Sequence, residues 1–118
     1  MIPKKYRLKS RKAFDATYKN KTITSDSMLI IYAGKCKKDE NQPTRYGFVV
    51  SKKYHKRSVK RNRIKRLMRE CVRLAIKQNK LANCEKYMSI ILIPKEKTIG
   101  CQLCDIEKSF FKLIARLK

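Results

Sequence analysis

The chain has 118 residues, 42% of them apolar, which suits one domain with one modest hydrophobic core. Lysine and arginine number 32 against 9 aspartates and glutamates, so the formal net charge is +23. Because like charges in such excess oppose compaction, they indicate a polyanionic partner, with nucleic acid as the first candidate and an anionic membrane surface as the second. We expect a single nucleic-acid-binding domain over residues 1–118.

No segment indicates export or membrane insertion. No apolar run approaches the roughly 20 residues that a membrane-spanning helix needs, and the basic N-terminal stretch lacks the apolar segment of a secretory signal. The odd number of cysteines indicates reduced thiols and a cytoplasmic protein. A single C-x-x-C without a second ligand pair disfavours a zinc site. We expect ordinary apolar or surface positions for all five cysteines, which are Cys36, Cys71, Cys84, Cys101 and Cys104.

The first half of the chain predicts one helix and two strands. A short helix is expected over about 11–19. Residues 27–34 form an apolar, β-branched run typical of a strand, and 45–53 has the character of a returning strand. The polar stretch 34–44 between them predicts an exposed loop. We therefore expect these two strands to pair antiparallel.

A long amphipathic helix is predicted from about 59 to 80. Apolar residues follow one another at steps of three and four, and the basic residues lie off this stripe. The expected core positions are Ile64, Leu67, Met68, Cys71, Val72, Ala75 and Ile76. A buried strand over 87–94, stopped by Pro94, and an amphipathic helix within 101–118 complete the chain.

The order helix-strand-strand-helix-strand-helix predicts a small two-layer α+β sandwich with the helices packed on one face of the sheet. The strands near 45–53 and 87–93 flank a helical crossover, so they can lie parallel in one sheet. Such crossovers are right-handed by default.

Basic residues are concentrated around the long helix. Eleven of the 22 residues from 52 to 73 are lysine or arginine, and only Glu70 offers an acidic partner there. A solvent-exposed helix face normally carries charges of both signs. This cluster therefore favours phosphate binding over an ordinary solvent-exposed surface. Asn62 lies between Arg61 and Arg63, where asparagine is a poor helix former. It indicates a polar contact to a base or sugar, with a tolerated surface residue or a cap as the alternative.

Aromatic residues form a second candidate site. Phe14 and Tyr18 share one face of the first predicted helix, and Tyr32, Tyr46 and Phe48 come from the strands. Aromatic rings beside basic residues provide a stacking surface for single-stranded bases. For Phe14, Tyr18 and Tyr32 the pattern leaves an ordinary core position equally open.

No catalytic set is recognisable. The single histidine has no pair of acids near it, and the sequence contains neither a glycine-rich phosphate loop nor a serine or cysteine nucleophile with a nearby base. If the chain takes part in a reaction, we expect the chemistry to belong to a partner.

The stretch SVKRNRIKRLMRE, residues 58–70, resembles the protein subunit of bacterial ribonuclease P, a family whose signature is an RNR helix. The preceding GFVVSKKYHKRSVKRNR is similar to the family's strand-to-helix passage, although YHKRSVK lacks a glycine that some members carry. The resemblance extends from YRLKSRKAFDATYKN to the closing helix, whereas GCQLCDIE matches no pattern of the family that we recognise.

The resemblance implies a protein that assists a catalytic RNA in removing the 5′ leader of precursor tRNA, with hydrolysis performed by the RNA subunit and its Mg²⁺. It implies a left-handed crossover through the RNR helix, which replaces the right-handed default. Contacts with the catalytic RNA would be made by Arg61, Asn62, Arg63, Lys65, Arg66 and Arg69. The leader cleft would be lined by Phe14, Tyr18, Tyr32 and Phe48 and flanked by Lys52 and Lys53.

Two other classes share part of this pattern. A structural RNA-binding protein of ribosomal type would have the same charge but would not need an exposed aromatic cleft. A DNA-binding helical module would place two helices on either side of a short turn, whereas the basic helix here is flanked by predicted strands.

Overall fold

The computed structural model of the protein describes residues 6–8, 11–19, 22–34, 44–51, 53–78, 80 and 87–116. Its elements, in chain order, are α1 (Arg11–Lys19), β1 (Thr22–Ser25), β2 (Leu29–Ala33), β3 (Arg45–Phe48), α2 (Ser58–Lys77), β4 (Ser89–Pro94), a short 3₁₀ helix η3 (Glu96–Thr98) and α3 (Leu103–Ala115). Most of the predicted loop 34–44 lies outside the described residues, as do Cys36, Lys52 and Cys84. None of the described helices is long and apolar enough to cross a membrane.

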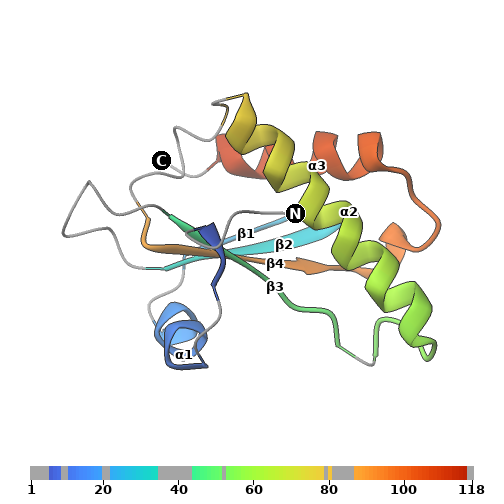
Figure 1. The fold of residues 1–118 in the computed structure, drawn as a ribbon, viewed down its shortest axis with the longest axis horizontal. Helices are drawn as coiled ribbons and strands as arrows, with labels where there is room; N and C mark the ends of the chain where they lie inside the picture. The colour runs from blue at the N-terminus through green and yellow to red at the C-terminus, as the bar shows by residue number, and fades with distance from the viewer. Residues whose placement is uncertain are drawn as a thin grey trace.

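The four strands form one mixed sheet in the order β1-β2-β4-β3 (Figure 1). Strand β4 pairs antiparallel with β2 and parallel with β3, so the predicted parallel pair is confirmed. The predicted antiparallel pairing of the strands at 27–34 and 45–53 is wrong, because β4 lies between them. Every residue of β4 but one is buried, and a strand apolar on both faces takes the centre of a sheet. The polar strand β1, which was not predicted from the sequence, forms an edge of the sheet.

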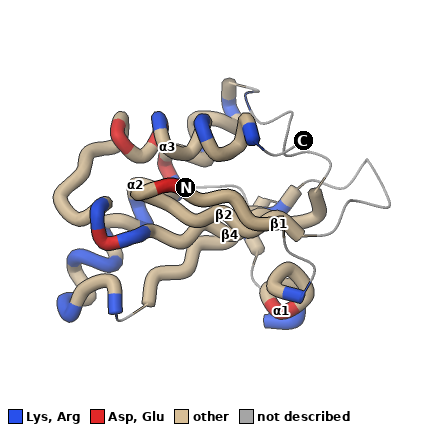
Figure 2. Tube along the Cα trace, turned by 180° about the vertical axis from the view of Figure 1, so that it is seen from behind, with Lys and Arg blue, Asp and Glu red and all other residues tan. Residues whose placement is uncertain are grey.

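The connection β3–α2–β4 is left-handed. In Figure 1 both strands run from left to right, β3 lies nearer the viewer than β4, and α2 passes above them. Figure 2 gives the opposite view and brings β1 and β2 to the front, which confirms the depth order. Crossovers between parallel strands are right-handed by default. The structure therefore follows the family resemblance on this point.

Helices α2 and α3 cover one face of the sheet and enclose the main core (Figure 1). The predicted stripe of α2 is confirmed, because its buried residues are Ile64, Met68, Cys71, Val72 and Ala75. Burial raises the pKa of the Cys71 thiol to about 12, so this cysteine stays a neutral core residue. The sheet contributes alternate side chains, among them Leu29, Ile31, Ile90 and Leu92.

Helix α1 lies on the opposite face of the sheet, so the expectation that all helices share one face holds for α2 and α3 but not for α1 (Figure 1). The α+β class is confirmed. The hydroxyl of Thr17 on α1 hydrogen-bonds the hydroxyl of Ser89 on β4, and both side chains are buried. Because the helix has only nine residues, it covers part of this face and leaves the rest open.

The turn between β1 and β2 is tied to α3 by Asp26. Its carboxylate accepts hydrogen bonds from the backbone N–H groups of Met28 and Leu29, at 2.8 and 2.9 Å, and from the Ser109 hydroxyl at 2.5 Å. Burial acts to raise the pKa of Asp26, but these hydrogen bonds and the charge of Lys112 outweigh it and lower the pKa below its ordinary value. The charged form of Asp26 therefore holds the turn and the helix together.

We predict that Ile64→Ala destabilises the protein by about 2–5 kcal/mol, because the side chain is 1% exposed and its loss leaves a cavity. The matched control is Val59→Ala, five residues earlier on α2, where the side chain is 73% exposed and the change should stay within about 0.5 kcal/mol. Thermal or denaturant unfolding of the two variants measures the difference. Equal losses would contradict the assigned core.

We predict that Asp26→Asn lowers the free energy of unfolding at pH 7 by about 1 kcal/mol and that the deficit shrinks in acid. Because the folded-state pKa is lowered, the stabilisation is fully present above the ordinary value near 4 and is lost as pH falls through the folded-state pKa. Denaturant unfolding between pH 7 and 2 measures this trend. Ser109→Ala should reduce the same acid-sensitive part of the free energy of unfolding. A stability deficit of Asp26→Asn that does not change with pH would contradict the role of the Asp26 charge.

Candidate nucleic-acid interface

An aromatic surface lies between α1 and the sheet. The Phe14 ring is seated on Gly47 of β3, where a side-chain Cβ would come within 2.7 Å of two ring carbons. One turn further along α1, Tyr18 contacts Tyr32 of β2 edge to face, with 5.5 Å between ring centroids. All three rings are half-buried. Burial, with smaller effects of Tyr32 and Asp15, raises the pKa of the Tyr18 hydroxyl, so this ring stays uncharged.

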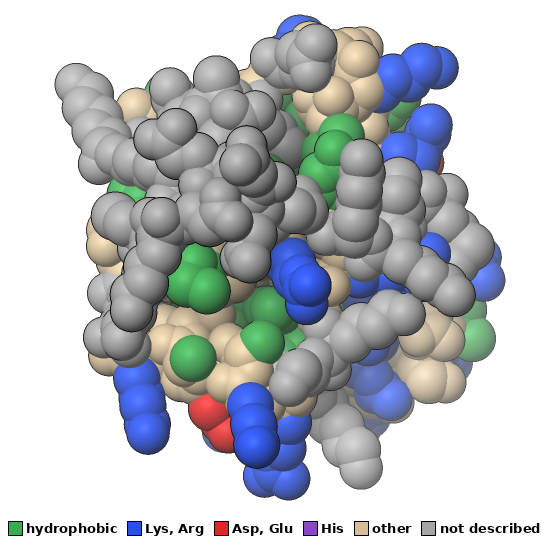
Figure 3. Space-filling model, turned by 60° about the vertical axis from the view of Figure 1, so that its left-hand side comes forward, with side chains coloured by type: hydrophobic (Ala, Val, Ile, Leu, Met, Phe, Trp, Pro, Cys, Tyr) green, Lys and Arg blue, Asp and Glu red, His purple; other side chains and the backbone are tan. Residues whose placement is uncertain are grey.

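The open part of this sheet face continues away from α1. Tyr32 pairs in register with Ile91 of β4 and with Ile23 of β1, whose side chain is 51% exposed. The next row on the same face contains Ile30 and Ile93, both half-buried. We call the surface formed by Tyr32, Ile23, Ile30 and Ile93 the open strip. Figure 3 shows a few exposed apolar side chains, in green, among Lys and Arg side chains, in blue, on the side of the molecule that lies at the left of Figure 1.

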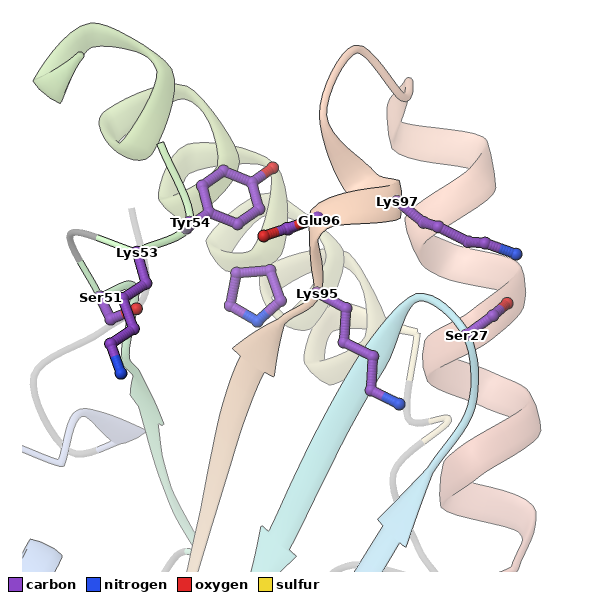
Figure 4. A pocket seen from close by; sticks show the side chains of 8 residues that line it. Ser27, Ser51, Lys53, Tyr54, Lys95, Glu96 and Lys97 are labelled. Carbon is purple, nitrogen blue, oxygen red and sulfur yellow. The ribbon is translucent and has the colours of Figure 1, made fainter. Parts of the chain in front are cut away.

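A basic pocket lies at the end of the open strip, where β3 and β4 both finish. It has a volume of about 490 Å³ and is open to solvent. Lys53 lies on one side, and Lys95, Lys97 and Ser27 lie on the other (Figure 4). Glu96 is the one acid among its lining residues, which also include Ser51, Tyr54 and Pro94. Three lysines against one carboxylate make the pocket suitable for an anionic group such as phosphate.

Helix α2 carries the densest positive charge in the described part of the chain. Figure 2 shows how far Lys and Arg positions, in blue, outnumber acids along this helix and the segment that leads into it. Asn62, Arg66 and Arg69 are exposed and Lys65 is half-buried, all of them off the core stripe. Glu70 pairs with Arg73 at 2.5 Å, and this is the one ion pair among the described residues. The other cations of α2 are left without a counter-charge in the described structure.

Arg61 and Arg63 differ from the other arginines of α2. The Nη1 group of Arg61 donates hydrogen bonds to the backbone carbonyls of His55 and Lys56, at 2.7 and 3.0 Å. The Nη2 group of Arg63 donates to the carbonyl of Cys101 at 3.0 Å. Both guanidinium groups therefore hold neighbouring segments of the protein.

The structure brings most of the predicted site residues into two groups. Phe14, Tyr18 and Tyr32 meet at the open strip, and the predicted RNA-binding residues of α2 share its outer surface. Phe48 does not join the first group. Side chains alternate along a strand, so Phe48, next to Gly47, points to the other face and packs against the main core. Lys52 lies outside the described residues.

Lys95, Lys97 and Gly47 were not among the site residues predicted from the sequence. A usable signal existed for the lysines, because they follow directly after a buried strand, and sites commonly form beyond the carboxyl ends of parallel strands. No such signal marked Gly47, because a small residue is informative only once the ring that needs its space is known.

The basic helix α2 and the aromatic, partly uncovered sheet face place this protein in the class of RNA-binding α+β proteins. The chain belongs to the ribonuclease P family, whose model matches residues 2–118. It is 35% identical over 111 residues to the ribonuclease P protein component of Clostridium kluyveri, covering 94% of this chain and 93% of that one. It is 30% identical over 113 residues to that of Clostridium botulinum, covering 96% and 95%.

Solved structures agree with this assignment. The RNase P protein of Staphylococcus aureus superimposes with a TM-score of 0.75 at 27% identity, covering 96% of this chain and 95% of that one. That of Thermotoga maritima reaches the same TM-score at 22% identity, over 95% of this chain and the whole of that one, and shows the fold. The role of the chain is therefore that of a protein subunit in the ribonuclease P holoenzyme, with the RNA subunit as its partner.

We predict that Gly47→Ala destabilises the protein by about 1–3 kcal/mol, because the added methyl group overlaps the Phe14 ring. A double-mutant cycle with Phe14→Ala, measured by thermal unfolding, isolates this contact. The cost of Gly47→Ala should fall clearly when Phe14 is already truncated. If the cost is the same in both backgrounds, the ring is not seated on Gly47.

Proposed function

We propose that the protein binds the single-stranded 5′ leader of precursor tRNA along the open strip while α2 contacts the catalytic RNA. The observation that carries the proposal is the arrangement of the strip, which has aromatic rings at one end and a lysine pocket at the other. Bases stack on aromatic rings, and lysines attract the phosphates that link those bases.

The strip suits a single strand rather than a duplex. Ile91 and Lys95 are four residues apart along one extended segment, which separates the two ends of the strip by roughly 13 Å. A single-stranded RNA that reaches both ends of the strip can therefore place bases on Tyr18 and Tyr32 and a phosphate in the pocket. In a duplex the base faces are hidden within the helical stack, and the rings at the strip would have nothing to stack upon.

We assign the contact with the catalytic RNA to the exposed surface of α2. Arg66 and Arg69 make no hydrogen bond or ion pair to the described part of the chain, so their guanidinium groups are available for phosphate. Lys65 lies beside them, and the amide of Asn62 at the exposed start of the helix suits a base or sugar edge. Arg61 and Arg63 belong to the same predicted set, but part of their donor capacity is used within the protein.

We assign hydrolysis to the RNA subunit, with Mg²⁺ held on that side and the assembly in the cytoplasm. In the described residues no three His, Cys, Asp or Glu side chains lie close enough to hold a metal ion. On this proposal the protein binds and orients the leader. The resulting ribonucleoprotein would be an endoribonuclease in which water is the nucleophile and the RNA subunit would hold the metal ion.

The direct test combines the protein, a bacterial catalytic RNA and a precursor tRNA with a 5′ leader. We expect the protein to lower the Mg²⁺ concentration needed for leader removal, and the purified protein alone to cleave nothing. Leader removal by protein free of RNA and of contaminating nuclease would contradict the assignment of the chemistry. An unchanged Mg²⁺ requirement would favour a purely structural RNA-binding role.

We predict that Tyr18→Ala weakens binding of precursor tRNA to the holoenzyme by about 1–3 kcal/mol, the value of one stacked base, with little effect on mature tRNA. Tyr18→Phe is the matched control, because it keeps the ring and its edge-to-face contact with Tyr32. Equilibrium binding of both RNAs to the three holoenzymes measures the effect. Equal losses for precursor and mature tRNA would place Tyr18 outside the leader path.

A further inference from the structure

Two lysine-bearing segments form the walls of the basic pocket, with Ser27 of the β1–β2 turn beside the second, and both segments follow parallel strands. The first, after β3, contributes Ser51, Lys53 and Tyr54, and the second, after β4, contributes residues 95–97. The walls are joined to each other, because the Tyr54 hydroxyl hydrogen-bonds the Thr98 hydroxyl at 2.8 Å in a buried position. The pocket therefore keeps its shape only while these two segments hold their places.

Arg61, near the start of α2, stabilises the turn that follows the first wall. One terminal nitrogen of its guanidinium bonds the carbonyls of both His55 and Lys56, in the turn between the pocket and α2. The backbone N–H of Arg57 bonds His55 Nδ1 at 3.0 Å within the same turn. Lys53, Lys56 and Arg57 repel one another in this short segment. Hydrogen bonds from a charged donor to the turn's carbonyls oppose that repulsion.

Arg63, half a turn further along α2, holds the second wall. It bonds the carbonyl of Cys101, and the backbone N–H of Cys101 bonds the carbonyl of Thr98 at 3.0 Å. The Thr98 hydroxyl and backbone N–H both return to the carbonyl of Lys95, at 2.7 and 3.0 Å. An unbroken series of hydrogen bonds thus runs from Arg63 to the lysine that lines the pocket.

We propose that Arg61 and Arg63 are positioning residues, which brace the two lysine-bearing walls so that the pocket receives an RNA phosphate, while Arg66 and Arg69 of the same helix meet phosphate directly. The RNR sequence thereby links the helix that faces the catalytic RNA to the pocket that ends the leader path. This inference rests on the proposed function for the identity of the ligand, but the bracing itself is a property of the free protein.

The first measurement is amide hydrogen exchange on the free, full-length protein. Arg61→Gln should speed exchange at Tyr54 and Arg57 about tenfold, because those amides bond within the turn that Arg61 holds. Arg63→Gln should do the same at Cys101. Arg66→Gln removes the same charge from the same helix and should leave these amides unchanged. Unchanged exchange in both Arg61→Gln and Arg63→Gln would overturn the proposal.

The second measurement is binding to the catalytic RNA with bound precursor tRNA, across a range of salt concentration. A lost phosphate contact flattens the slope of log affinity against log salt by about 0.7–0.9, which we expect for Arg66→Gln. Arg61→Gln should lower affinity severalfold with a slope change below about 0.4, half a contact. In Arg61→Gln the pocket lysines still contact phosphate, so the slope changes little. The affinity falls because the loosened wall must be ordered again when the RNA binds. A larger slope change for Arg61→Gln would mean direct phosphate contact and overturn the proposal.

The two measurements separate the bracing from the function on which it rests. If the wild-type protein fails to bind the RNA, the proposed function is wrong, and the exchange data still decide whether Arg61 and Arg63 brace the walls. If Arg61→Gln does not fold, Arg61→Lys replaces it in the exchange experiment. The shorter lysine side chain lacks the planar guanidinium and reaches these two carbonyls less well, so the proposal expects partial loss of protection, and full protection overturns it.

Discussion

Strand β4 is buried on both faces, and the positions of the other elements follow from that constraint. Its two edges must be paired, so β2 and β3 lie on either side of it and the polar strand β1 is left at the rim. Both faces must also be covered. Helices α2 and α3 cover one of them fully, whereas α1, with nine residues and a length of about 13 Å, covers only part of the other. The open strip is what this unequal coverage leaves exposed.

The charge of the protein is separated from its core. With a net charge of +23 and a single ion pair among the described residues, electrostatics oppose the folded state rather than support it. The apolar core between the sheet and helices α2 and α3 supplies the stability, and the cations stand outside it. RNA relieves the repulsion, because phosphates supply the negative charge that the chain lacks. Binding and folding are therefore favoured together in the assembled particle.

Helix α2 connects three parts of the molecule. Its apolar stripe anchors it to the sheet, and its first two turns hold the walls of the basic pocket through Arg61 and Arg63. Its outer surface presents cations that have no acidic partner among the described residues. Neighbouring residues on one helix can serve different surfaces because each step along the helix turns the side chain by about 100°. The same short basic motif can thus brace the protein and face the RNA.

The sequence by itself determined the class of the fold, the extent of α1, the core stripe of α2, and the family, because periodicity and the RNR motif are local properties of the chain. It could not determine that β4 separates β2 from β3, or that α1 crosses to the other face, since both depend on which surfaces bury one another. Local alternation could not place Phe48 in the core until the face covered by α2 and α3 was known. The bracing bonds of Arg61 and Arg63 are also tertiary, because a guanidinium in a basic helix looks the same in sequence whether it meets a phosphate or a carbonyl of its own chain.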